Sequence, residues 1–142
     1  MTARPGRRSL PAAAAAATAT ALLLSACQSE PMGGPLVLEV GASAPVAALQ
    51  QINEAGARCW MRSGDRAFAD YRLVPELDTR VGTPRLLIVE RARSEGLPQL
   101  VIEAAGDPVR IVTYGPLTAQ RLGGRINGDI MRWSAGSRAC RG

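Results

Sequence analysis

The chain of 142 residues contains no histidine and no lysine. The absence of histidine excludes Ser-His-Asp and Cys-His catalysis and zinc sites that use histidine, because each of them needs an imidazole. The absence of lysine excludes Ser-Lys dyads and Schiff-base chemistry. Neither the GxGxxG nucleotide-binding motif nor a P-loop occurs. An enzyme built from this sequence would therefore depend on carboxylates, and no cofactor or metal is expected.

Aromatic residues are also few, with two Trp, two Tyr and one Phe in the whole chain. Trp60 and Trp133 each lie close in sequence to a cysteine, Cys59 or Cys140. We expect one aromatic cluster packed around these two cysteines. The alternative is an exposed platform on which a sugar or a protein stacks, although a carbohydrate groove usually needs more aromatic residues than this core can spare.

The N-terminal segment has the parts of a secretory signal. Arg4, Arg7 and Arg8 form a positively charged region, and residues 11–24 form a short, alanine-rich apolar run. The run is too short to span a bilayer, since a spanning helix needs about 20 apolar residues. It ends in the sequence LSAC at residues 24–27, in which two small residues precede a cysteine. Such a pattern is typical of a cleaved signal peptide.

These residues resemble the signal peptide and lipobox of bacterial lipoproteins. The resemblance implies that residues 1–26 are removed and that Cys27 becomes a lipidated N-terminus in the cell envelope. Gln28 follows the cysteine, and in this class the absence of Asp at that position favours the outer membrane, facing the periplasm. Two alternatives stay open: an ordinary secretory signal that leaves Cys27 as a plain thiol, and twin-arginine export, which Arg7 and Arg8 suggest.

Removal of the signal also changes the charge balance. Three of the 17 basic residues leave with it, which leaves 14 arginines against 12 acidic residues, a net charge of +2. The basic pI therefore gives no argument for nucleic-acid binding, and no nucleic-acid partner is expected. Residues 27–40, which include a Pro-, Gly- and Ser-rich stretch, predict a lipidated cysteine with a flexible tether, and residues 41–142 predict one domain.

Cys59 and Cys140 are the two cysteines that remain in this domain. In an oxidising compartment an even pair predicts a disulfide, and this one would close almost the whole domain. The alternative is two free thiols, one of them reactive.

Hydrophobic periodicity predicts a helix, four strands and a second helix. Ser43 as N-cap and Pro45 in the first turn begin the first helix, whose apolar face ends near Trp60. Apolar segments separated by Gly and Pro turns predict four strands, at 67–74, 85–91, 99–104 and 109–114. The second helix is expected at 117–133, weakened by glycines at 123, 124 and 128.

Short links between the strands favour an antiparallel meander, because parallel strands need long crossovers. The predicted fold is α+β: a four-stranded antiparallel sheet flanked by an N-terminal and a C-terminal helix, in the order α-β-β-β-β-α, with one disulfide. Both helices are expected to cover the same face of the sheet.

Two groups of charged residues are candidate sites. Glu76 and Asp78 lie two residues apart in a loop bounded by prolines, and with Asp70 they could form an acidic cluster suited to glycoside hydrolysis or calcium binding. The alternative is a solvated loop with ordinary charges. On the second helix, one stripe carries three arginines that could bind an anion or an acidic partner: Arg121, Arg125 and Arg132. The alternative here is a solvated basic face.

The sequence thus favours a small envelope lipoprotein without catalytic activity, anchored in the membrane through Cys27. It would bind an envelope protein or a cell-wall component as an adaptor or assembly factor. A carboxylate-dependent hydrolase of cell-wall glycan, using Glu76 and Asp78, is one alternative. A carrier of lipid or another apolar ligand, held between sheet and helices, is the other.

Overall fold

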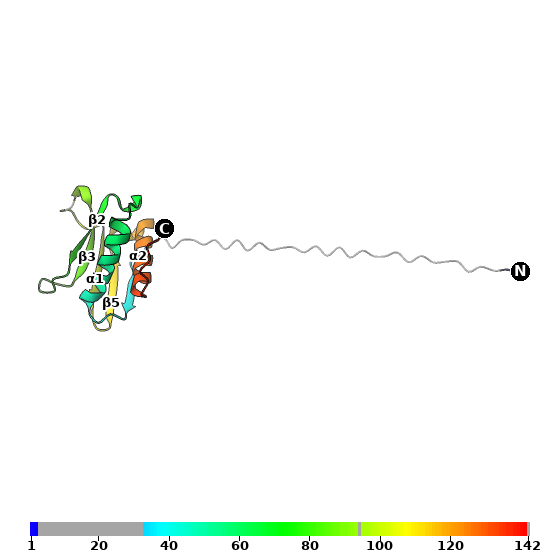
Figure 1. Cartoon of the computed structure of the whole chain (residues 1–142), viewed down its shortest axis with the longest axis horizontal. Helices are drawn as coiled ribbons and strands as arrows, with labels where there is room; N and C mark the ends of the chain where they lie inside the picture. Colours follow the sequence, from blue (N-terminus) through cyan, green and yellow to red (C-terminus); the bar gives the residue numbers. More distant parts are fainter. Residues whose placement is uncertain (3–32, 94, 142) are drawn as a thin grey trace.

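The computed structural model describes residues 1–2, 33–93 and 95–141 (Figure 1). The predicted signal peptide, apart from its first two residues, and Cys27 lie outside the described residues, so lipidation stays a prediction. Within the described part of the chain, none of the helices is long and apolar enough to cross a bilayer.

A five-stranded antiparallel sheet forms the centre of the domain, in the order β1-β5-β4-β3-β2. The strands are β1 (Val37–Val40), β2 (Tyr71–Glu76), β3 (Arg85–Glu90), β4 (Leu100–Ala105) and β5 (Val109–Tyr114). The last four strands follow one another as the predicted meander, which is confirmed. The first predicted strand begins late, because residues Arg66–Phe68 form a 3₁₀ turn, η2, in which the Asp65 side chain accepts a hydrogen bond from the Ala67 N–H.

The prediction of four strands is wrong by one, because β1 lies inside the segment assigned to the tether. β1 has only four residues and pairs with β5, with Val37 opposite Val112 and Val40 opposite Val109. A strand this short gives little local periodicity, and its partner lies some seventy residues later in the sequence. Residues 37–40 therefore belong to the sheet.

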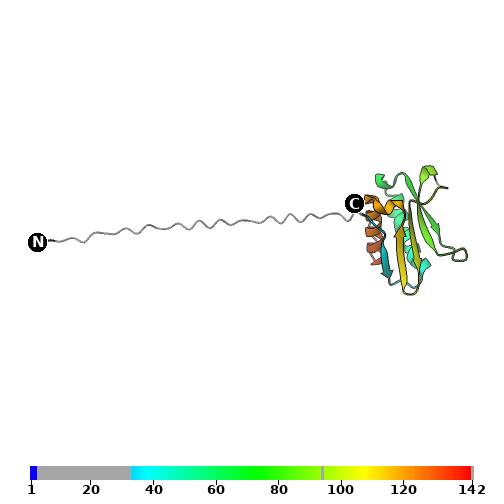
Figure 2. The ribbon, with the colours of Figure 1, turned by 180° about the vertical axis from the view of Figure 1, so that it is seen from behind.

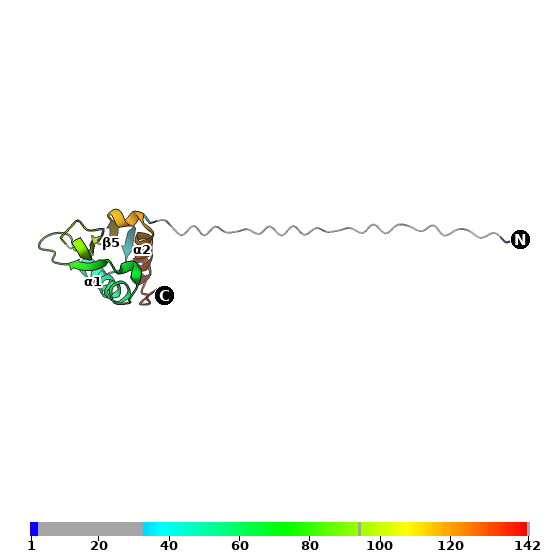
Figure 3. The same cartoon turned by 90° about the horizontal axis from the view of Figure 1, so that it is seen from above.

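Two helices pack on the same face of the sheet, as predicted (Figures 1 and 3). The first, α1 (Pro45–Gly56), continues directly into a π-helical turn, η1 (Ala57–Met61). The second, α2 (Arg121–Ser134), follows a 3₁₀ turn, η4 (Pro116–Ala119). One core cluster joins both helices to the inward side chains of the strands, and its largest buried members include Trp60, Trp133, Phe68, Leu49, Ile52, Leu86 and Ile88.

The boundaries of α1 have specific causes. Pro45 occupies the first turn as predicted, but Ser43 is not the N-cap: Ala44 holds that position without a side-chain hydrogen bond. At the other end, the Trp60 ring lies directly on Gly56. A Cβ atom at Gly56 would lie 2.7 Å from Cε3 of Trp60, so only glycine leaves room for the indole there.

Glycine has a comparable role at the start of α2. A Cβ atom at Gly123 would lie 2.2 Å from the carbonyl oxygen of Leu117, so this glycine lets η4 pack against the helix. Gly115, with φ of 120°, makes the turn from β5 into η4. Glycines lower the helix propensity of α2, but one of them, Gly123, is required by the packing against η4.

The disulfide between Cys59 and Cys140 is confirmed, with Cα atoms 5.2 Å apart. The predicted aromatic cluster beside it is confirmed as well. The ring centroids of Trp60 and Trp133 lie 4.8 Å apart, and those of Trp60 and Phe68 lie 5.5 Å apart. Both indoles are almost fully buried, so they are core residues of the domain and not a stacking platform.

Candidate functional site

Arg125 and Arg132, two of the predicted binding arginines on α2, form ion pairs with aspartates of the domain. Arg125 forms an ion pair of 2.5 Å with Asp65, and its guanidinium lies 5.2 Å from the centre of the Phe68 ring. Arg132 forms an ion pair of 2.5 Å with Asp129. Arg121 is exposed at the first turn of the same helix. The stripe therefore holds neighbouring segments in place, and less of its charge faces solvent than the helical spacing suggests.

Asp129 is the centre of a buried polar cluster. It is 1 % exposed, and its carboxylate accepts a hydrogen bond of 2.9 Å from Trp60 Nε1 and contacts the guanidinium groups of Arg132 and Arg141, the latter at 3.3 Å. Trp133 Nε1 donates to the carbonyl of Ala139 at 3.2 Å. These contacts hold the C-terminal tail against α2, next to the disulfide.

Asp65 gives the protein an acid-sensitive contact. The pKa of Asp65 is held below its ordinary value, first by the hydrogen bond from the Ala67 N–H and then by the hydrogen bond from Arg125. Because the folded-state pKa is lowered, the contact stabilises the fold above about pH 4, the ordinary pKa of the carboxyl, and this stabilisation is lost as pH falls through the folded value. We expect Asp65→Asn to lower the free energy of unfolding by about 1 kcal/mol at neutral pH and by less near pH 3.

Urea unfolding of both proteins at the two pH values measures this effect. Asp107→Asn, at an exposed hairpin position, is the control and should leave the difference near zero at both. An Asp65→Asn cost that is the same at both pH values would contradict the prediction.

The predicted carboxylate pair does not form a cluster. Glu76, in β2, pairs with Arg85 of β3 at 2.6 Å, and Asp78 pairs with Arg80 in the following loop. Arg80 lowers the pKa of Asp78 through these hydrogen bonds. Asp70 joins neither pair, and within the described residues no three His, Cys, Asp or Glu side chains come together to hold a metal ion.

No helix of the described residues covers the second face of the sheet (Figure 2). We call it the open face. The strand pairing and the alternation of side chains place these residues on it: Val37, Glu39, Arg72, Val74, Glu76, Arg85, Leu87, Val89, Val101, Glu103, Ala105, Arg110, Val112 and Tyr114. Val89 and Val101 lie on this face and outside the core cluster, yet they are almost fully buried, so neighbouring residues cover this part of the face.

An apolar row crosses four strands of the open face. Val74 pairs with Leu87, Leu87 with Val101, and Val101 with Tyr114. Tyr114 is 42 % exposed, whereas Leu87 and Val74 are half-buried by their neighbours. Side chains directly opposite on adjacent strands are in contact distance, so these four pack together in one apolar row, in which Val101 is buried and Val74, Leu87 and Tyr114 reach solvent.

A charged row runs beside the apolar one. Glu76 pairs with Arg85, and Arg85 lies opposite Glu103. The Tyr114 hydroxyl donates to Glu103 Oε2 at 3.2 Å, which joins the two rows. The pKa of Tyr114 is raised, mainly by burial and then by the negative charge of Glu103. Tyr114 therefore stays a neutral donor throughout the physiological range.

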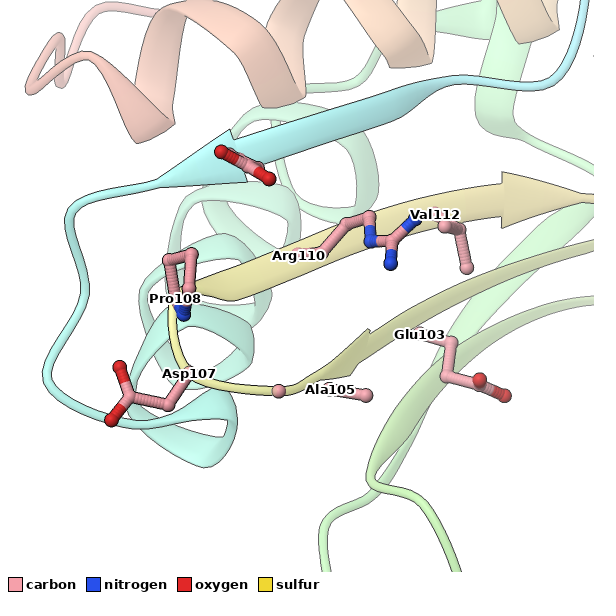
Figure 4. A pocket seen from close by; sticks show the side chains of 8 residues that line it. Glu103, Ala105, Asp107, Pro108, Arg110 and Val112 are labelled. Atoms are coloured by element: carbon pink, nitrogen blue, oxygen red, sulfur yellow. The ribbon is translucent and has the colours of Figure 1, made fainter.

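A hollow of about 410 Å³ lies at one end of the open face, beside the β4–β5 hairpin (Figure 4). Its charged lining residues are Glu39, Glu103, Asp107 and Arg110. Figure 4 shows the Asp107 carboxylate pointing away from the Arg110 guanidinium. To the residues that the structure describes, the Arg110 side chain makes no hydrogen bond or ion pair, and Arg110, Glu39 and Asp107 are all exposed to solvent.

No family model matches the chain, and no curated protein or solved structure matches it either. The sequence pattern predicts the arginines of α2 and the pair Glu76 and Asp78 as candidate sites, but it does not indicate the open face. The alternation that indicates this face is present in Val109–Tyr114, where the exposed Arg110 lies between the inward Val109 and Ile111. In β3 the continuous apolar run at residues 86–89 hides this alternation, because apolar side chains point to both faces of the sheet there.

Proposed function

We propose that the protein is a lipid-anchored envelope protein without catalytic activity, which binds a partner protein through the open face of its sheet. The observation that carries this proposal is the apolar row from Val74 to Tyr114, on a sheet face that no helix covers in the part of the chain that the structure describes. An apolar centre with a polar rim is the usual anatomy of a protein interface. The lipobox sequence at residues 24–27 supports the anchor.

The charges of the open face indicate the chemistry of the partner. The face and its hairpin carry four carboxylates, Glu39, Glu76, Glu103 and Asp107, against three arginines, at 72, 85 and 110. The open face itself is therefore balanced, with three carboxylates against three arginines, and Asp107 adds one negative charge at its hairpin end. A partner with an apolar strip and charges of both signs, with a basic group near the hairpin, would complement it.

The test is crosslinking in the producing cell, followed by recovery of the full-length lipoprotein from membranes and mass spectrometry. Val37→Asp introduces a charge at a position of the open face that is already 63 % exposed, so the fold tolerates it. We expect recovery of the partner to fall about tenfold, the effect of losing about 1.4 kcal/mol of binding free energy. Leu87→Asp, in the apolar row, should have a larger effect.

Val81→Asp is the matched control, because Val81 is 85 % exposed in the β2–β3 loop, away from the open face. Its partner recovery should equal that of the unchanged protein. Cys27→Ala should abolish recovery from membranes. Equal recovery with Val37→Asp and Leu87→Asp, both verified as folded by circular dichroism, would refute binding through the open face.

A further inference from the structure

The chain joins the domain at one fixed position. The carbonyl of Gly34 accepts a hydrogen bond of 2.7 Å from Asn127 of α2, and Leu36 exchanges hydrogen bonds with Thr113 of β5, each 2.9 Å long. A Cβ atom at Gly33 would lie 2.1 Å from the carbonyl oxygen of Thr118, so the backbone at residue 33 lies against η4. The first residues of this segment that the structure describes therefore lie at the η4–α2 corner.

The chain between this corner and Cys27 is short. Six residues, 28–33, lead from Cys27 to the corner, and six residues span at most about 22 Å even when fully extended. A domain of about 100 residues has a radius of gyration of about 13 Å and is roughly 30 Å across. A lipid on Cys27 would thus hold the end of the domain that contains Gly33 close to the bilayer and keep the opposite end away from it.

The strand pairing shows what else lies at this end. β1 starts here, and the antiparallel order places the start of β2, the end of β3, the start of β4 and the end of β5 beside it. We call this the anchor end; it is at the top of the domain in Figure 1. The opposite, far end contains the β2–β3 loop and the β4–β5 hairpin.

The β3–β4 loop at the anchor end exposes one leucine, and its two arginines are balanced by Glu90 and Glu95. Leu97 is 89 % exposed, although contact of a leucine side chain with water is unfavourable. The side chain of Arg93, in the 3₁₀ turn η3 (Arg91–Arg93) of this loop, is 81 % exposed and lies 3.5 Å from Glu90. An exposed apolar side chain beside arginines is typical of segments that enter the headgroup region of a bilayer.

Charge distinguishes the two ends as well. The loops and turns of the anchor end, residues 62–70, 90–99 and 115–125, contain six arginines and four acidic residues. Those of the far end, residues 41–44, 77–84 and 105–108, contain one arginine and two aspartates. Anionic lipid headgroups attract the first distribution and repel the second.

We propose that the anchor end rests on the membrane surface, with Leu97 inserted among the lipid headgroups and the neighbouring arginines facing anionic lipid. This inference rests on the lipid anchor of the proposed function. The strands then run away from the bilayer, and the open face points sideways, where a partner in the same membrane or in the periplasm reaches it without displacing lipid.

The test uses the full-length, acylated protein in vesicles of phosphatidylethanolamine and phosphatidylglycerol. Leu97→Cys or Val81→Cys is labelled with an environment-sensitive nitrobenzoxadiazole dye, since the native Cys59 and Cys140 are joined in a disulfide. We expect a blue shift of the dye and loss of its fluorescence on adding doxyl-labelled lipid at position 97 only. Val81 is the matched control, because it is 85 % exposed at the far end.

A second pair of variants tests the charge. With the dye at position 97, Arg93→Glu should weaken quenching. Arg80→Glu should not, because Arg80 lies in the β2–β3 loop at the far end, where its side chain is 87 % exposed. Equal quenching at 97 and 81, or none at 97, overturns the inference. Mass spectrometry of the same sample separates this outcome from failure of the proposed function: an unacylated Cys27 removes the anchor, while an acylated protein with a solvated position 97 refutes only the orientation.

Discussion

Replacing Asp129 with alanine is expected to lower the free energy of unfolding by about 2–3 kcal/mol, the upper part of the usual cost of leaving a buried hydrogen-bond donor without its acceptor. The Asp129 carboxylate is 1 % exposed and contacts two arginines and the Trp60 indole. Its removal leaves the Trp60 N–H buried without an acceptor. It also leaves the charge of Arg132 without its carboxylate beside the aromatic cluster.

Urea unfolding followed by tryptophan fluorescence measures this loss, because Trp60 and Trp133 both lie in the affected region. Asp129→Asn keeps an oxygen for the indole but removes the charge, so it should cost less than alanine. Asp107→Ala, at an exposed hairpin position, controls for loss of an acidic side chain and should change the free energy by less than about 0.5 kcal/mol. If Asp129→Ala were as mild as Asp107→Ala, the cluster would not be a source of stability.

Loss of the disulfide is expected to have a comparable effect. Cys59 and Cys140 are separated by 81 positions, and the loop-entropy relation gives about 4.5 kcal/mol for closing a loop of that length. The Cys59→Ala/Cys140→Ala double variant should lose much of this amount. Its tail would still be held by Asp129 and by the carbonyl of Ala139, so the native fold should persist at low temperature.

Thermal unfolding of the unchanged protein with and without a reductant gives the matched comparison. Cys59 is buried but Cys140 is exposed, so reduction should reach the bond in the folded protein. The reduced protein should match the double variant in its free energy of unfolding. A double variant as stable as the oxidised protein would show that the tail contacts alone fix the C-terminus.

The local pattern of the sequence was sufficient for the meander and both helices, because each has enough apolar residues to show its period. Strand β5 is the clearest example, since Val109, Ile111 and Thr113 alternate with outward residues. β1 could not be found in the same way. Its four residues depend on pairing with β5, whose partner positions lie some seventy residues later in the chain, so no local pattern indicates it.

The candidate sites show the same limit. A helical period places Arg121, Arg125 and Arg132 on one stripe, and Asp129 lies near it on the same helix. Nothing local indicates that Asp65, sixty positions before Arg125, pairs with it. The proline-bounded loop likewise suggested that Glu76 and Asp78 act together, but cross-strand pairing joins Glu76 to Arg85. Spacing along the chain predicts which residues share an element, and tertiary contacts decide which charges remain available.

The position of β1 determines how the domain would carry a mechanical load. A pull transmitted from Cys27 would enter at Gly33, ahead of β1, while a partner held on the open face would resist it. If this force acts along the strand, it loads the β1–β5 ladder from Val37 to Val40 in shear. The hydrogen bonds of the ladder then resist the force together and not one after another. The bond from Asn127 to Gly34 would take the load first, ahead of the ladder. The sheet would thus act as a strain-bearing joint between membrane and partner.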